Sequence, residues 1–158
     1  MSRMDRRFED TGMGSPGRFL TFRLARVQAK LNAQSSRILR DHAGITLTQW
    51  RLLALIGNAG RTTAAVLSRE VAMDKGLISR NIKTMVSDGL VRITLDPDDN
   101  RAQHLELSEA GNKMFTETLP RMRARQDALR ALFDIEEEEV FNRVLDKLDR
   151  IADDRDHG

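Results

Sequence analysis

The fold is decided by residues 68–111, which read SREVAMDKGLISRNIKTMVSDGLVRITLDPDDNRAQHLELSEAG. In the first half of this stretch, apolar residues recur every three or four positions, which predicts a helix that begins after Asp74 and ends at Gly89. In the second half they recur at every second position: Val91, Ile93 and Leu95, then Leu105 and Leu107. Two alternating runs on either side of a polar loop predict a β-hairpin.

Helical spacing also precedes this stretch. We expect one helix over residues 18–42, stopped by Gly44, and a second that ends at Gly57 and Gly60. The expected N-caps of the next helices are side chains that can accept a hydrogen bond from the first turn: Thr48, then Thr62 or Thr63, then Asp74. Three short helices followed by a hairpin is the order of elements in a winged helix-turn-helix.

Two longer helices are expected after the hairpin. Ser108 is placed to cap the first, which extends to about Leu132 and which Pro120 should kink or split in two. Asp134 and Glu137 form a capping-box pattern at the start of the second. The expected fold class is therefore mainly α with a small β-hairpin.

Composition excludes several classes of protein. Of the 158 residues, 40% are hydrophobic and 32% charged, and no apolar run approaches the roughly 18 to 20 residues of a membrane span. The chain has no cysteine and only three scattered histidines, so we expect no disulfide, no metal and no cofactor. Residues 1–17 lack the apolar core of a signal peptide, and we expect a flexible leader on a cytoplasmic protein.

Charge is distributed unevenly along the chain. Residues 1–41 contain nine basic and four acidic side chains, a net charge of +5. Residues 134–158 contain four basic and ten acidic side chains, a net charge of −6. Ends of opposite sign permit end-to-end pairing of two copies, and two separately solvated helix faces are the alternative.

The helix after Asp74 carries the candidate DNA-binding residues. At about 100° per residue, Ile78, Ile82 and Met85 share one face and leave the opposite face polar. In helix-turn-helix proteins such a face enters the major groove, where arginine and lysine suit guanine. The predicted DNA contacts are Lys75, Gly76, Leu77, Ser79, Arg80, Lys83 and Thr84. An ordinary amphipathic helix with a solvated face is the alternative.

The loop between the two strands contains a second candidate. Arg101 at the tip of a hairpin can enter the minor groove, where the negative potential is strongest. Asp99 can aim the guanidinium through a charge-assisted hydrogen bond. The alternative is a solvated turn in which Asp99 and Arg101 form a surface ion pair worth under about 1 kcal/mol.

Residues 68–111 resemble the core of the MarR family of bacterial transcription regulators. The family pattern joins L-x-x-x-G-L-V-x-R to a wing with D-x-R and then to L-x-L-(S/T)-x-x-G. This chain has MVSDGLVR at residues 85–92, DNR at residues 99–101 and LELSEAG at residues 105–111. It departs from the family at Met85, where leucine is common, and at Pro97, Asp98 and Asn100, where the family often has more basic residues.

The resemblance implies a homodimer that binds double-stranded DNA. A winged helix-turn-helix domain over residues 45–108 would read a pseudo-palindromic operator, and N- and C-terminal dimerisation helices, residues 18–44 and 109–154, would join two copies. The residues expected in the dimer contact are Phe19, Phe22, Val140, Phe141, Val144 and Leu148. Members of the family usually repress genes and release DNA when a small phenolic or lipophilic acid binds, so such an effector is implied here.

Two other functions are alternatives to DNA-binding regulation. A winged helix can serve protein contact or scaffolding without an operator, and a steep dependence of DNA affinity on salt would separate the two. An enzyme is disfavoured, because the chain has no cysteine, its histidines lack metal-ligand spacing, and Ser79 and Ser108 have explanations on their helices. We therefore expect no catalytic residues.

Overall fold

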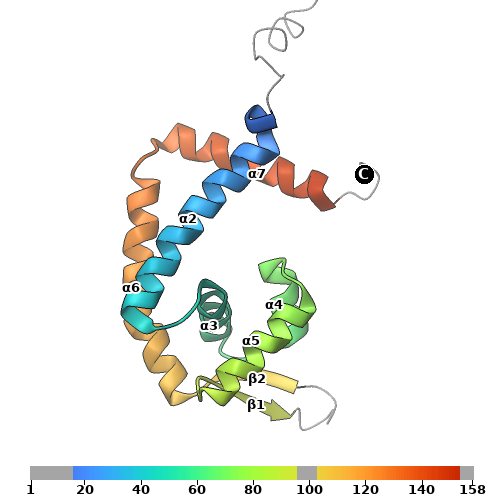
Figure 1. Cartoon of the computed structure of the whole chain (residues 1–158), viewed down its shortest axis with the longest axis vertical. Coiled ribbons are helices and arrows are strands. Elements are labelled where there is room, and N and C mark those ends of the chain that lie inside the picture. Colours follow the sequence, from blue (N-terminus) through green and yellow to red (C-terminus); the bar gives the residue numbers. More distant parts are fainter. Residues whose placement is uncertain (1–15, 96–102, 154–158) are drawn as a thin grey trace, which may run out of the picture. The chain divides into compact units, whose positions relative to one another are not determined.

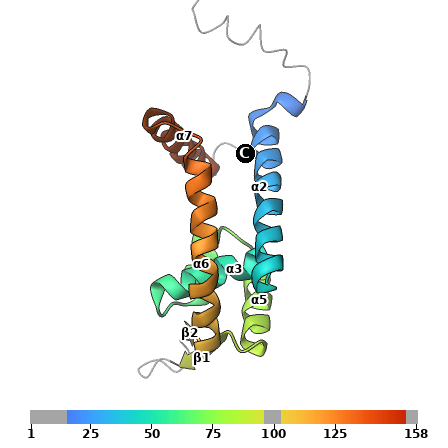
Figure 2. The same cartoon turned by 90° about the vertical axis from the view of Figure 1, so that its left-hand side faces the viewer.

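The computed structural model describes residues 16–95 and 103–153. A short 3-10 helix, η1 (Pro16–Arg18), comes first, and the remaining elements follow it in this order (Figures 1 and 2): α2 (Leu20–Ala43), α3 (Leu47–Ala59), α4 (Ala64–Val71), α5 (Lys75–Ser87), β1 (Val91–Leu95), β2 (Gln103–Leu107), α6 (Glu109–Arg130) and α7 (Ile135–Asp153). The expected mainly α fold with a small hairpin is confirmed. Contacts within the chain divide it into two compact units, Met1–Phe115 and Thr116–Gly158.

The stretch that decides the fold forms the expected elements. Oδ2 of Asp74 accepts a hydrogen bond of 2.9 Å from the amide of Leu77, which confirms Asp74 as the cap of α5. Gly89 follows the helix in the left-handed region, with a φ of 73°. β1 and β2 then pair antiparallel, with Val91 opposite Leu107 and Leu95 opposite Gln103.

Two expectations about α3 are wrong. Its cap is Thr46 rather than Thr48, because Thr46 and Gln49 form a reciprocal capping box with hydrogen bonds of 2.9 and 3.1 Å. Gly57 lies inside the helix, and the C-cap is Gly60. A β-carbon at Gly57 would lie 2.9 Å from the Phe115 ring, so this glycine makes room for a packed side chain instead of ending the helix.

Two backbone hydrogen bonds join the hairpin to the segment that precedes α4. The amide of Thr62 donates to the carbonyl of Leu105 at 3.1 Å, and the amide of Leu105 donates back at 2.8 Å. Thr63, the second of the two expected residues, caps α4 by accepting from the amide of Val66 at 3.3 Å. β2 is therefore held beside the start of α4, and the hairpin has a defined position in its unit.

The core of the first unit is built from the apolar faces of α2 to α5 and the hairpin. The most deeply buried side chains are Leu39, Leu52, Leu53, Ile56, Leu67, Ile78 and Met85. Trp50 extends this core by stacking on Phe115, with 6.1 Å between ring centroids. Burial of Ile78, Ile82 and Met85 confirms the inward face expected for α5.

α6 begins at the expected cap and continues through its proline. Oγ of Ser108 accepts from the amide of Gly111 at 3.0 Å and donates to the carbonyl of Gly89 at 2.5 Å. The helix runs from Glu109 to Arg130 with Pro120 inside, so the possible split in two does not occur. Proline removes one helical hydrogen bond, and the others are sufficient to keep the helix continuous.

The second unit contains α7 and the turn before it. Asp134 and Glu137 form the expected capping box, with hydrogen bonds of 2.8 and 3.1 Å. Arg130 donates to Glu138 at 2.7 Å across the turn, and this hydrogen bond raises the pKa of Arg130 above its ordinary value. None of the helices in the described ranges is both long and apolar enough to cross a membrane.

Candidate nucleic-acid interface

All seven residues that the sequence nominated for DNA contact lie on α5. Lys75, Leu77, Ser79 and Arg80 are exposed, as are Lys83 and Thr84 in the following turn, and Gly76 is half-buried. The buried face of the same helix packs against α3, α4 and β1. The packing of the buried face therefore fixes the position of α5, and its polar face remains accessible to a ligand.

Gly76 has a local role at the start of α5. A β-carbon there would lie 2.9 Å from Oδ2 of Asp74 and 3.4 Å from Nη1 of Arg80. The glycine thus leaves room for the capping carboxylate and for the Arg80 side chain, which lies back over the first turn. A larger residue would displace one of the two groups.

Two polar side chains of α5 hydrogen-bond to the helix itself. Oγ1 of Thr84 donates to the carbonyl of Arg80 at 3.1 Å, and Nδ2 of Asn81 donates to the carbonyl of Leu77 at 2.9 Å. The hydroxyl of Thr84 therefore offers its oxygen as an acceptor. Such a group suits the exocyclic amino groups of adenine and cytosine.

The hairpin beside α5 carries apolar side chains that the core does not use. Leu105 and Leu107 are buried, but Ile93 is 44% exposed and Leu95 is 56% exposed. On the other face of the hairpin, Arg92 pairs with Glu106 at 2.9 Å. Arg61 also lies 3.6 Å from Glu106. Asp99 and Arg101, nominated for the wing, lie outside the described residues.

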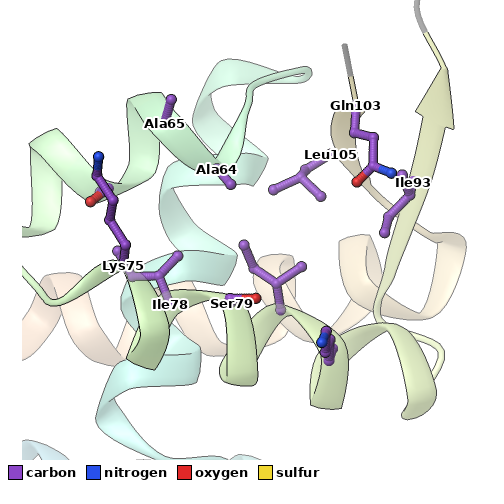
Figure 3. A pocket seen from close by; sticks show the side chains of 11 residues that line it. Ala64, Ala65, Lys75, Ile78, Ser79, Ile93, Gln103 and Leu105 are labelled. Carbon is purple, nitrogen blue, oxygen red and sulfur yellow. The ribbon is translucent and has the colours of Figure 1, made fainter. Parts of the chain in front are cut away.

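A groove of about 320 Å³ lies between α4, α5 and the hairpin. Figure 3 shows Ala64 of α4 facing Ile78 and Ser79 of α5, with Leu105, Ile93 and Gln103 on the strands. Lys75 and Lys83 also line it, so the groove is continuous with the polar face of α5. The sequence alone did not nominate Ala64, Ser68, Ile93 or Gln103 for DNA contact, since strand alternation at Ile93 served only to predict the hairpin.

The residues nominated for a dimer contact are accessible in the single chain. Phe19 at the start of α2 and Phe22 within it are exposed, and so are Val140, Phe141 and Val144 on α7, while Leu148 is half-buried. α7 also borders a groove of about 450 Å³, whose apolar lining includes Phe133, stacked on Phe141 at 5.8 Å. The same groove is lined by three acids, Asp134, Glu136 and Glu137.

The described ranges, residues 16–95 and 103–153, contain no gathering of three histidine, cysteine, aspartate or glutamate side chains that could hold a metal ion. The polar face of α5 itself carries cations and hydrogen-bonding groups on exposed side chains. These groups suit phosphates and base edges.

Asp74 permits a first test of how α5 is held. Asp74→Ala is expected to lower the free energy of unfolding by about 1 kcal/mol, because the amide of Leu77 loses its partner. Asp74→Asn should keep most of the stability, since asparagine is an equally good cap, and should raise DNA affinity by removing a negative charge. Urea unfolding and DNA titration measure the two effects. Equal stability of Asp74→Ala and the parent would contradict the capping role.

Comparison with known proteins yields consistent matches. A model of the MarR family matches residues 43–102. The transcriptional repressor IacR of Pseudomonas putida is 24% identical over 110 residues, which cover 70% of this chain and 61% of the relative, so the chain spans about three-fifths of that protein's length.

Two solved structures have the same fold. A MarR/EmrR family transcriptional regulator from Acinetobacter sp. ADP1 superposes with a TM-score of 0.79 at 22% identity, covering 84% of this chain and 94% of the other. A mutant MarR from E. coli complexed with operator DNA superposes with a TM-score of 0.66 at 22% identity, covering 81% and 94%. The fold is therefore one that binds DNA in a solved complex.

Proposed function

We propose that the chain is a DNA-binding transcription regulator of the MarR family, as the match of the family model to residues 43–102 supports, and that it represses genes as a homodimer on a pseudo-palindromic operator. The observation that carries this proposal is the polar face of α5, with Lys75, Arg80 and Lys83 exposed on a helix whose other side is buried. Three cations on one helix suit a major groove, where arginine and lysine meet guanine and the flanking phosphates.

The winged helix-turn-helix over residues 45–108 is the proposed DNA-binding domain. In it, α4 crosses the DNA backbone and α5 enters the major groove, as in other helix-turn-helix proteins. The hairpin, held to the start of α4 by the Thr62–Leu105 pairing, would point toward the neighbouring minor groove. Residues 18–44 and 109–154 are the proposed dimerisation region, and residues 1–17 a leader.

The proposed dimer contact covers two exposed apolar surfaces. One comprises Phe19 and Phe22 at the start of α2, and the other is the α7 groove with Val140, Phe141 and Val144. Large exposed apolar patches of this kind mark interaction sites. The first turn of α2 has a basic residue, Arg23, and no acid, whereas that of α7 has three acids, so opposite charges in two copies would attract. Two copies would then place two α5 helices about 34 Å apart, one turn of DNA.

The wing supplies a test that concerns one side chain. Arg101→Ala is expected to weaken operator binding by about 1–3 kcal/mol, because a direct contact in the minor groove is lost. Fluorescence anisotropy titration of the operator measures the change, and circular dichroism controls for folding. Operator affinity equal to that of the parent, with the fold intact, would contradict the proposed role of Arg101.

We further propose that a small phenolic or lipophilic acid releases the protein from its operator, as the family resemblance implies. A thermal-shift screen of aromatic and fatty carboxylic acids would find such an effector. Addition of a stabilising acid should then lower operator affinity in the same titration. Stabilisation without any loss of DNA affinity would contradict release.

The function as a whole is tested by recovering the bound DNA. Purified protein should retain a small set of genomic fragments that share an inverted repeat, and the logarithm of its affinity should fall steeply with the logarithm of salt concentration. A protein-interaction module without an operator is the alternative. It would retain no common fragment and show no such salt dependence.

A further inference from the structure

We propose that α5 divides its DNA contacts between two parallel stripes of side chains. The backbone stripe, Lys75, Ser79 and Lys83, holds one sugar–phosphate strand of the DNA together with Gln103 of β2. The base stripe, Gly76, Arg80 and Thr84, faces the base pairs and decides which sequence is bound. This division rests on the proposed function and adds to it a separation of affinity from specificity.

The two stripes differ in their position around the helix. At about 100° per residue, Lys75, Ser79 and Lys83 follow one another along the side of α5 that borders the groove. Arg80 and Thr84 lie further around the helix and do not line the groove. The structure thus separates six of the seven candidate residues of α5 into a set that lines the groove and a set that does not, and Leu77 belongs to neither stripe.

The geometry of B-DNA determines what must occupy the groove. A major groove and its neighbouring minor groove are separated by a single sugar–phosphate strand. If α5 enters the major groove and the hairpin points toward the next minor groove, that strand passes between them. The surface between α5 and the hairpin is the groove of about 320 Å³, and its occupant is therefore the DNA backbone.

The lining of the groove matches the chemistry of that strand. Lys75 and Lys83 supply positive charge, and Ser79 and Gln103 supply hydrogen-bond donors, all on exposed side chains. These groups suit phosphate oxygens, which receive most of the hydrogen bonds in protein–DNA complexes. Charge and donors at the rim thus point to a polyanion rather than to an uncharged ligand.

The floor of the groove matches the sugar. Ile93 is 44% exposed in the chain, although its cross-strand partner Leu105 is buried. Figure 3 shows both side chains on the groove side of the hairpin, with Leu105 beside Ala64 and Ile93 further along the wall. An apolar floor beneath a cationic rim fits a deoxyribose, whose carbon atoms would cover Ile93 while the phosphates reach the lysines.

The base stripe has the properties needed for sequence readout. Arg80 is exposed and its guanidinium lies back over Gly76, where Nη1 would be 3.4 Å from an added β-carbon. Thr84 presents an acceptor because its hydroxyl hydrogen is bonded to the carbonyl of Arg80. A guanidinium and an acceptor one turn apart suit guanine and an exocyclic amino group on neighbouring base pairs.

Two variants that remove one positive charge each from the same helix test the division. Lys83→Gln should weaken binding to operator and to unrelated DNA by the same factor, and should reduce the salt slope by about 1. Arg80→Gln should weaken operator binding by about 10- to 100-fold and unrelated DNA much less. Each affinity is measured at several salt concentrations on both DNAs.

Chemical interference supplies an independent readout. Ethylation of the phosphates between the major and minor groove should block the parent protein, and Lys83→Gln should relieve that block at one phosphate, whereas Arg80→Gln should not. Ile93→Asp, at an exposed position that leaves the core intact, should lower affinity on both DNAs because it places a carboxylate beneath a phosphate.

The outcomes separate this inference from the proposed function. If the parent protein binds no DNA with a steep salt dependence, the proposed function fails. If it binds but Lys83→Gln changes sequence preference and retains the parent's salt slope, the division into stripes is wrong. Arg80→Gln that weakens both DNAs by the same factor would overturn it equally.

Discussion

Replacing both Val140 and Phe141 with aspartate is expected to convert the protein to a monomer and to weaken binding to a two-half-site operator about 100- to 10,000-fold. Both side chains line the α7 groove and are more than 40% exposed in the single chain. A second copy would cover them, and a carboxylate buried there without a partner carries a large desolvation cost.

The expected loss of operator affinity is large because the dimer joins two DNA-binding domains that bind two half-sites. In a dimer, binding of the first α5 makes binding of the second intramolecular, and a monomer loses that advantage. Affinity for a single half-site should therefore change little. Analytical ultracentrifugation measures the oligomeric state, and anisotropy titration of one and two half-sites measures binding.

A control variant exists on the same helix at two exposed positions that do not line the groove. Asn142→Asp combined with Arg143→Gln lowers the net charge by two, as the paired aspartate variant does, and leaves the apolar groove unchanged. This control should remain dimeric and bind the full operator. A Val140→Asp, Phe141→Asp protein that stays dimeric with the parent's affinity would show that α7 is not the dimer contact.

Gly111→Ala is expected to lower the free energy of unfolding by about 3 kcal/mol or more, a value at or above the upper end for overpacked sites. A β-carbon at this position would lie 2.0 Å from the carbonyl oxygen of Leu90. That oxygen cannot easily move, because it accepts a hydrogen bond of 3.0 Å from the amide of Ser108. The clash is with backbone, so no change of rotamer relieves it.

Gly111 lies where α6 meets the turn between α5 and β1. A clash at this position should therefore also disturb the end of the helix that carries the candidate DNA contacts. The melting temperature is expected to fall by roughly 10 °C. Ala110→Ser, at the exposed neighbouring position, should leave it nearly unchanged. Differential scanning calorimetry measures both variants. A Gly111→Ala protein as stable as the parent would mean that α6 can move away from Leu90 at little cost.

Local signals in the sequence were reliable where one side chain acts on its own backbone. Asp74 and Ser108 cap the helices that follow them, and Gly89 adopts the left-handed turn after α5, as expected. The cap of α3 was misplaced because Thr46 and Thr48 both have the required hydroxyl. Only Thr46 has Gln49 three residues later to complete a capping box.

The sequence could not show which apolar residues find partners. Gly57 resembles a helix end, and only the packing of Phe115 against α3 explains why it lies inside the helix. Ile93 alternates like a core residue, yet it lines the groove beside α5. Alternation reveals which side chains share a face of a strand, but it does not reveal how far along the strand that face is covered.

The sequence by itself determined the order of the helices and strands, the polar face of α5 and the family resemblance, because these depend on spacing along one chain. Only the tertiary structure decided that Lys75, Ser79 and Lys83 border a groove with the hairpin while Arg80 does not. The physical reason is that residues distant in sequence, Ala64, Ile93 and Gln103 among them, form the opposite wall, and their position depends on how α4 and β2 are held together through Thr62 and Leu105.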